Sequence, residues 1–146
     1  MQKFVDGVLV DMTAKEVAEF ETSRAVDLPV LKAALKATID TAAETERLKY
    51  ITPGAGQALT YAQKADQAKA YLAATAPVDA DYPLIMAEIG ITGATAAEVA
   101  DVIAASFAAW QVIGSQIEAA RLGAKKAIDQ AETAEQAQAA FDEATV

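Results

Sequence analysis

Cysteine and histidine are both absent from this sequence of 146 residues. Without cysteine the chain has no disulfide and no thiol nucleophile, and without histidine it has no imidazole for acid–base catalysis. The usual ligands of a protein-bound zinc ion are missing with them. We therefore expect no metal, no cofactor and no catalytic residue, and interpret the chain as a protein that is not an enzyme.

Basic residues are also scarce. Lysine and arginine number 12 against 21 aspartate and glutamate residues, which gives a net charge of −9. Nucleic acids and anionic membranes attract cationic protein surfaces, so neither is expected as a partner. No basic residue lies between Lys69 and Arg121. Buried alanine-rich faces explain this stretch in one interpretation, and a neutral to acidic docking surface for a protein partner explains it in the other.

Long apolar runs are missing too. The most apolar run, residues 102–114, contains Ser106 and Gln111 and is too short to cross a bilayer, which takes about 20 residues. Near the N-terminus, Asp6 and Gly7 stand where an export signal has its apolar core. The sequence therefore predicts neither a membrane span nor an export signal.

What the sequence does contain is a helical pattern, longest in residues 95–130. Apolar or small residues recur there in alternating steps of four and three, the spacing of a heptad seam. The seam consists of Val99, Ile103, Ser106, Trp110, Ile113, Ile117, Ala120, Ala124 and Ala127. Because it thins to alanine, we expect its C-terminal half to pack more weakly. At roughly 1.5 Å per residue the helix spans about 50 Å, more than a small bundle covers, which predicts self-association along the seam.

An N-terminal β-hairpin is predicted before the helices. Apolar residues lie on both sides of Asp6-Gly7, and Asp-Gly is the strongest short-range signal for a two-residue turn. Two strands alone are marginal in water, so the hairpin must lie against a helix or pair with another chain. We interpret residues 1–12 as an attachment element and residues 13–146 as a helical body. A core role for the hairpin is the alternative.

Three capping boxes indicate helix starts in that body. Each has a threonine followed three residues later by glutamate or glutamine, namely Thr13 with Glu16, Thr95 with Glu98, and Thr133 with Gln136. Pro53 and Gly54 form the sharpest break in the chain, where we expect its direction to reverse. The predicted helices occupy residues 13–51 (two helices), 57–90 (two helices), 95–130 and 133–143. The predicted fold is all-α, an alanine-rich helical bundle with one long C-terminal heptad-patterned helix and a short N-terminal β-hairpin.

Three residue patterns that bear on chemistry have simpler structural explanations. Gly54-Ala55-Gly56 lacks the third glycine and the preceding strand of a nucleotide-binding loop, and we interpret it as a turn. Asp79 and Asp81 lack the further ligands of a calcium loop. Glu16 and Glu19 lie one helical turn apart without a partner to tune either pKa, so they belong to a solvated helix face.

Trp110 is the only tryptophan and lies on the seam. It is interpreted as a core anchor, with an exposed hot spot for a partner as the alternative. Residues proposed for protein interaction come from the hairpin and the seam. They are Phe4, Val8, Val10, Val99, Ile103, Trp110, Ile113 and Ile117.

Several segments resemble small proteins encoded in phages and prophages among tail and tail-fibre genes. The resemblance is carried by the run from Tyr50 to Tyr61 (YITPGAGQALTY), and it extends over most of residues 50–130. Its further segments are Lys64 with Ala70-Tyr71-Leu72, then Tyr82-Pro83-Leu84, Ala109-Trp110-Gln111 and the run from Ile117 to Lys125; Val5-Asp6-Gly7-Val8 with Met12-Thr13 is similar to openings in that group.

The resemblance implies a structural protein of the virion, associated with the tail or tail fibre and assembled in the bacterial cytoplasm. Its partners would be other phage tail or fibre proteins and further copies of itself, and the resemblance supplies no catalytic residue. An assembly chaperone that leaves before the particle is finished is the second hypothesis. A helical bundle that holds a small apolar ligand is the third.

Overall fold

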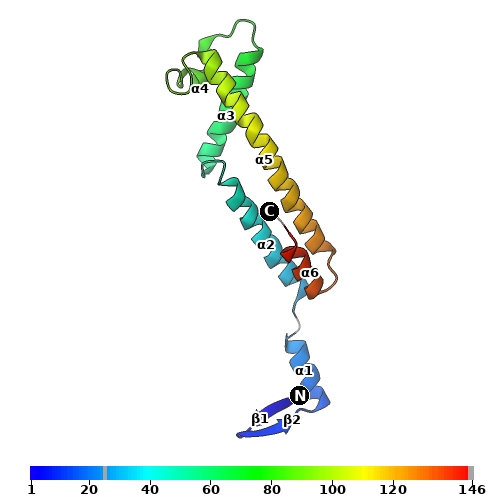
Figure 1. Ribbon diagram of the computed structural model, residues 1–146. Helices are drawn as coiled ribbons and strands as arrows, with labels where there is room; N and C mark the ends of the chain where they lie inside the picture. Colours follow the sequence, from blue (N-terminus) through cyan, green and yellow to red (C-terminus); the bar gives the residue numbers. More distant parts are fainter. Residues whose placement is uncertain (25, 145–146) are drawn as a thin grey trace.

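The structure, a computed structural model, describes residues 1–24 and 26–144. It confirms the all-α fold with one long helix and an N-terminal hairpin (Figure 1). In chain order the elements are β1 (Gln2–Val5), β2 (Val8–Asp11), α1 (Ala14–Arg24), α2 (Leu28–Arg47), α3 (Ala55–Ala73), the 3-10 helix η1 (Asp79–Asp81), α4 (Pro83–Met86), α5 (Ala96–Gln130) and α6 (Ala134–Asp142).

The predicted caps begin the helices. At α5 the Glu98 amide donates to Thr95 Oγ1 at 3.3 Å and the Thr95 amide donates to Glu98 Oε2 at 3.2 Å, a complete capping box. Thr13 and Glu16 make the same reciprocal pair before α1. Asp27 accepts from the Val30 amide at 3.2 Å and caps α2. Local side-chain chemistry therefore fixes where these helices start.

Helix α5 is the spine of the helical body, because α2, α3, α4 and α6 all contact it. Helices α2 and α3 lie along it one after the other, α2 beside its C-terminal half and α3 beside its N-terminal half (Figure 1). The expected reversal of the chain at Pro53 and Gly54 is therefore wrong. A reversal there would leave half of α5 uncovered, whereas the chain bends, continues in the same direction as α3, and turns back only between α3 and α5.

The core consists of two separate clusters, one toward each end of α5. Near its start, Val99 and Ile103 pack with Ile85 of α4 and Ala68 of α3. Near its end, the cluster is made by Leu35, Ile39, Ala124, Ile128 and Ala137 from α2, α5 and α6. Neither cluster includes Trp110, which lies between them along the helix. The body is thus joined at two ends and more open in the middle.

The heptad seam is buried at four of its nine positions, namely Val99, Ile103, Ile117 and Ala124, and its last position is not buried. Ala127 is exposed, and Ile128 is fully buried in its place. Because a straight helix has 3.6 residues per turn, a strict 3.5-residue pattern drifts off the buried face, and a step of four restores contact. Ile128 and α6 give the C-terminal half a core cluster that the seam alone does not show, while its weaker packing stays a prediction.

The length of α5 does not by itself require a second copy of the chain. Among the described residues, Val99, Ile103 and Ile117 are buried inside the chain, where the shorter helices cover the seam. The premise that a small bundle cannot cover so long a helix is therefore wrong, because two shorter helices placed end to end do so. Self-association itself stays a prediction.

By length and composition, α5 is also apolar enough to cross a membrane, and only 17% of its apolar window is buried. The expectation of no membrane span rests on residues 102–114 alone, whereas the apolar stretch of α5 that meets this criterion is longer. A mostly buried core helix of a soluble protein meets the same criterion.

An ion-pair ladder joins α2 to the C-terminal half of α5. Asp40 accepts from Arg121 at 2.6 Å and from Lys125 at 2.7 Å. Glu118 accepts from Arg47 at 2.7 Å and from Arg121 through two nitrogens at 2.9 and 2.7 Å. Hydrogen bonds from Lys125 and then Arg121 lower the pKa of Asp40, and those from Arg121 lower the pKa of Glu118. Both carboxylates therefore stabilise the fold while ionised.

We expect the free energy of unfolding to fall as the pH drops below about 4. The folded pKa values of Asp40 and Glu118 lie below their unfolded values, so their contribution is complete above the unfolded pKa and is lost as pH falls through the folded pKa. Asp40→Asn should lower stability at neutral pH, and its difference from the native chain should shrink in acid. Urea unfolding at several pH values measures both effects.

Asp66→Asn is the matched control for this prediction. Asp66 is exposed on α3, so its variant should follow the pH profile of the native chain. A stability difference for Asp40→Asn that stays constant from neutral to acid pH would contradict the assignment.

Candidate functional site

The first candidate site is the hairpin. Val5 pairs with Val8 across a two-residue turn, in which Asp6 has φ of 49° and Gly7 has φ of 81°. Two positive φ values in succession are characteristic of a type I′ turn, whose twist matches that of the strands. The predicted Asp-Gly hairpin is confirmed. Because the sheet has only these two strands, each strand keeps one open edge.

The register divides the apolar side chains between two faces. Phe4 pairs with Leu9, whereas Lys3 pairs with Val10 on the other face. Phe4 is 72% exposed and Leu9 is 49% exposed. Lys3 makes an ion pair with Glu16 of α1, so its face lies nearer that helix. The structure thus separates Phe4 from Val8 and Val10 and gives it Leu9 as a neighbour. Leu9 is not among the residues proposed from the sequence, although period-two alternation about the turn indicates it.

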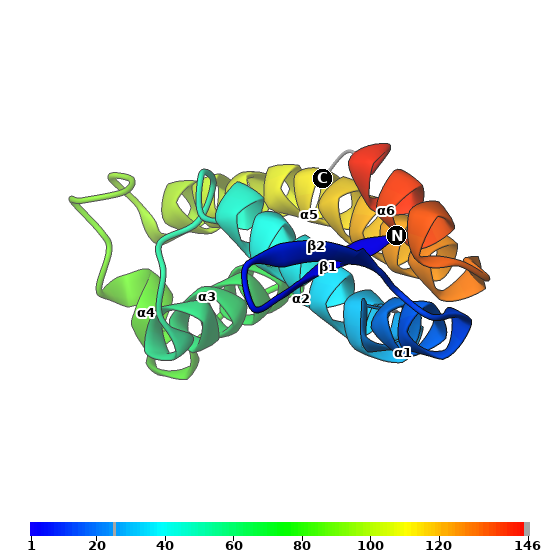
Figure 2. The same ribbon diagram turned by 90° about the horizontal axis from the view of Figure 1, so that it is seen from below.

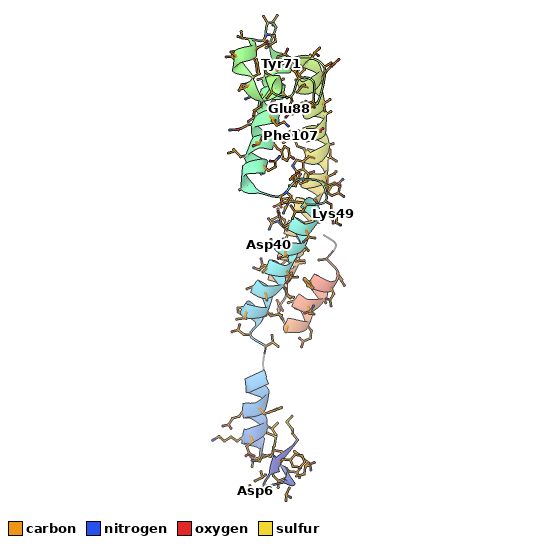
Figure 3. All side chains as sticks on the ribbon, turned by 90° about the vertical axis from the view of Figure 1, so that its left-hand side faces the viewer. Asp6, Asp40, Lys49, Tyr71, Glu88 and Phe107 are labelled. Carbon is orange, nitrogen blue, oxygen red and sulfur yellow. The ribbon has the colours of Figure 1, made fainter. Side chains whose placement is uncertain are left out.

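The hairpin is not part of the core in the described chain. No described element from α2 onward contacts β1, β2 or α1. Figure 1 shows the hairpin and α1 together beyond the end of the helical body, Figure 2 shows the hairpin in front of α2 when the molecule is seen from below, and in Figure 3 Asp6 marks the end opposite Tyr71. The expected division at residue 12 stays a prediction, but these contacts favour a boundary after Arg24, with α1 as the stem of the hairpin.

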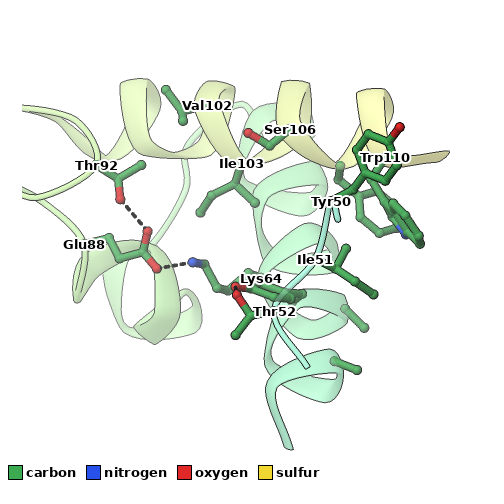
Figure 4. A pocket seen from close by; sticks show the side chains of 14 residues that line it. Tyr50, Ile51, Thr52, Lys64, Glu88, Thr92, Val102, Ile103, Ser106 and Trp110 are labelled. Carbon is green, nitrogen blue, oxygen red and sulfur yellow. Dashed lines mark hydrogen bonds and ion pairs between the residues drawn. The ribbon is translucent and has the colours of Figure 1, made fainter. Parts of the chain in front are cut away.

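The second candidate site is a cavity of about 480 Å³ in the middle of the body. It lies where the α2–α3 connection passes over α5, between the two core clusters, and the segment after α4, with Glu88 and Thr92, closes one side (Figure 4). Its aromatic lining comes from Tyr50, Tyr61, Phe107 and Trp110. A volume of this size falls in the range of small-molecule pockets, about 300–1,000 Å³.

One end of the cavity is charged but internally neutralised. Lys64 of α3 pairs with Glu88, which also accepts from Thr92 Oγ1 at 2.7 Å (Figure 4). Burial raises the pKa of Glu88, but the hydrogen bonds from Lys64 and Thr92 outweigh it and leave the pKa below its ordinary value. The ammonium of Lys64 also lies 5.8 Å from the centre of the Tyr61 ring. The cavity can therefore hold an apolar molecule with a small polar end.

Trp110 is half-buried and lines this cavity. It is therefore neither the fully buried anchor nor the exposed hot spot that the sequence leaves open. A Cβ at Gly114 would lie 3.2 Å from Trp110 Cζ2, so the indole packs against the helix where that side chain is missing. Residues four apart on a helix are neighbours, so a glycine at position 114 leaves room for the indole of Trp110 to lie against the helix. This spacing is the sequence signal for the position of the indole, which lines the cavity.

The remaining predicted positions are placed as follows. Val99 is fully buried, Ile103 and Ile117 are nearly so, and Ile113 is half-buried, all facing neighbours within the chain. Gly54 has φ of 122° and caps α3, whereas Ala55 and Gly56 are the first residues of that helix, so the predicted turn holds for Gly54 only. Asp79 and Asp81 lie in η1, and the described residues contain no cluster of three potential metal ligands. Glu16 caps α1 and pairs with Lys3.

Comparison with known proteins finds no relative for the chain. No protein-family model, no curated protein and no solved structure matches it. The resemblance to phage tail-region proteins therefore rests on the quoted residues alone.

Trp110→Ala should lower the free energy of unfolding by about 1–3 kcal/mol, less than the 3–5 kcal/mol typical of a fully buried aromatic side chain. The half-buried ring borders a cavity, so fewer contacts are lost. Urea unfolding followed by circular dichroism measures the difference, and Trp110→Phe should recover most of it. A loss well above this range would show a true core anchor.

Proposed function

We propose that the chain is a non-enzymatic structural component of a bacteriophage particle, associated with the tail or tail fibre. It attaches to another virion protein through its N-terminal hairpin. The observation that carries this proposal is the exposure of Phe4 and Leu9 on a two-stranded ribbon that stands apart from the helical body. The resemblance of residues 50–130 to tail-region proteins supports the phage context.

The hairpin has the two properties of an attachment element that works by strand addition. Its open edges present unpaired backbone amides and carbonyls that an extended segment of a partner can continue as a third strand. Its exposed side chains then supply the apolar contact, with Phe4 and Leu9 as neighbours on one face. Since no described helix from α2 onward contacts the strands, those helices can fold without them.

The double variant Phe4→Ser with Leu9→Ser should keep the helical spectrum and melting temperature but lose incorporation into purified particles. The reason is that both side chains are exposed before attachment and buried after it. Deletion of residues 1–12 should behave in the same way. The matched control is Leu59→Ser with Ile91→Ser, which removes two exposed apolar side chains, 60% and 81% exposed, from the body instead.

Quantitative immunoblotting of gradient-purified particles gives the readout. Normal incorporation of the hairpin variant, or unfolding of the truncated chain, would contradict the proposal. A native chain that binds a fibre protein but is missing from finished particles would instead favour the assembly chaperone.

The cavity favours a second candidate function, the binding of a small apolar ligand. Its aromatic lining and its size are the specific observations. A neutral apolar dye, N-phenyl-1-naphthylamine, should bind saturably and quench Trp110, because the single indole lines the cavity. Ala62→Phe should abolish the effect by filling the cavity, whereas Ala73→Phe, at an exposed position elsewhere on α3, should not. Equal quenching in both variants would rule out this site.

A further inference from the structure

The outer face of α5, turned away from α2 and α3, is exposed and apolar. Residues 102–117 contain no charged side chain. On this face Val112 is 59% exposed and Leu122 is 53% exposed. The solvent face of a helix in a globular protein normally carries charged residues. A helix with its inner seam already covered therefore has a second apolar surface that lacks a neighbour in the described chain.

This outer face has a heptad pattern of its own. Its apolar and small positions are Ala105, Ala108, Val112, Ser115, Ala119 and Leu122, all exposed and separated by alternating steps of three and four residues. Asp101 precedes the first by four residues, and Lys126 follows the last by four. The pattern is that of a helix–helix contact face bounded by one acidic and one basic residue.

The positions are symmetric about the point between residues 113 and 114. If an identical helix lies antiparallel across that point, Asp101 faces Lys126 of the other copy at both ends. The same register places Ala105 opposite Leu122, and Val112 opposite Ser115. Small residues then meet larger ones along the contact, so the two backbones can approach closely. A parallel pair would instead set Asp101 against Asp101 and Lys126 against Lys126.

We propose that a second copy of this chain packs antiparallel against the outer face of α5, related by a two-fold axis that passes between residues 113 and 114. Such a contact is isologous, because the same face is used by both copies. It spans about 37 Å between residues 101 and 126 at 1.5 Å per residue. The contact does not involve the hairpin, so it is independent of the proposed attachment.

The bounding charges support this occupant. Asp101 and Lys126 are exposed, and neither forms an ion pair in the part of the chain that the structure describes. The next charges outward are already engaged, since Glu98 completes the capping box of α5 and Asp129 pairs with Lys36. Among the charged residues of α5, the two that the antiparallel register brings together are thus the two without an ion-pair or capping partner in the described chain.

Disulfide cross-linking tests the register, and the chain has no cysteine of its own to interfere. Ala105→Cys and Leu122→Cys, each alone, should not cross-link. An oxidised mixture of the two variants should yield a covalent dimer of about twice 15.2 kDa. Cross-linking of either variant with itself would show a parallel pair and overturn the proposal.

Charge reversal gives a second test that does not depend on engineered thiols. Asp101→Lys should weaken dimerisation by about tenfold or more, because it places like charges together at both ends of the contact. Combining it with Lys126→Asp should restore the dimer to within about threefold. The controls are Asp66→Lys and Lys69→Asp, exposed positions on α3 that should leave dimerisation unchanged. Sedimentation velocity across a concentration series measures all of these.

Two outcomes would overturn the proposal outright. One is a native chain that stays at 15.2 kDa at every concentration. The other is flotation of the chain with phosphatidylcholine vesicles while it remains a monomer, which would assign the outer face of α5 to lipid.

Discussion

Burial of the inner seam of α5 is the constraint on which the rest of the structure depends. A 35-residue helix is too long for any one helix of this chain to cover, and α2 and α3 share the task by lying end to end. This arrangement decides where the chain turns. The chain reverses its direction only after α3, which ends beside the start of α5. It also decides where the packing is weakest. Two helices that meet end to end leave a junction, and the cavity lies at that junction.

The two core clusters and the ion pairs between α2 and α5 together stabilise the helical body. Near the start of α5, burial is supplied by branched side chains of α4 and α5 together with Ala68 of α3. Near its end, leucine and isoleucine pack with alanines, and Asp40 and Glu118 bind arginine and lysine beside them. Partly exposed ion pairs contribute modestly to stability, but they fix the register of α2 on α5. The acidic chain thus uses several of its few basic residues inside this one contact.

The three surfaces considered for function differ in what they need from a partner. The hairpin presents open strand edges and exposed apolar side chains, which suit an extended segment of another protein. The cavity is enclosed on several sides and suits a small molecule. The outer face of α5 is long, uncharged and self-complementary, which suits a second copy of the chain. A particle component that attaches by one end and pairs along its length would use the first and third surfaces together.

The sequence by itself determined the local structure. Asp6-Gly7 set the turn, Thr95 with Glu98 set the start of the long helix, and heptad spacing identified most of its buried face. These features depend on neighbours within a few residues, so the sequence contains all the information they need. Tertiary structure alone decided that α3 continues beyond α2, that Ile128 replaces Ala127 in the core, and that Trp110 borders a cavity. Each of these depends on which distant helices share α5, and the pattern of one helix does not specify the order in which others cover it.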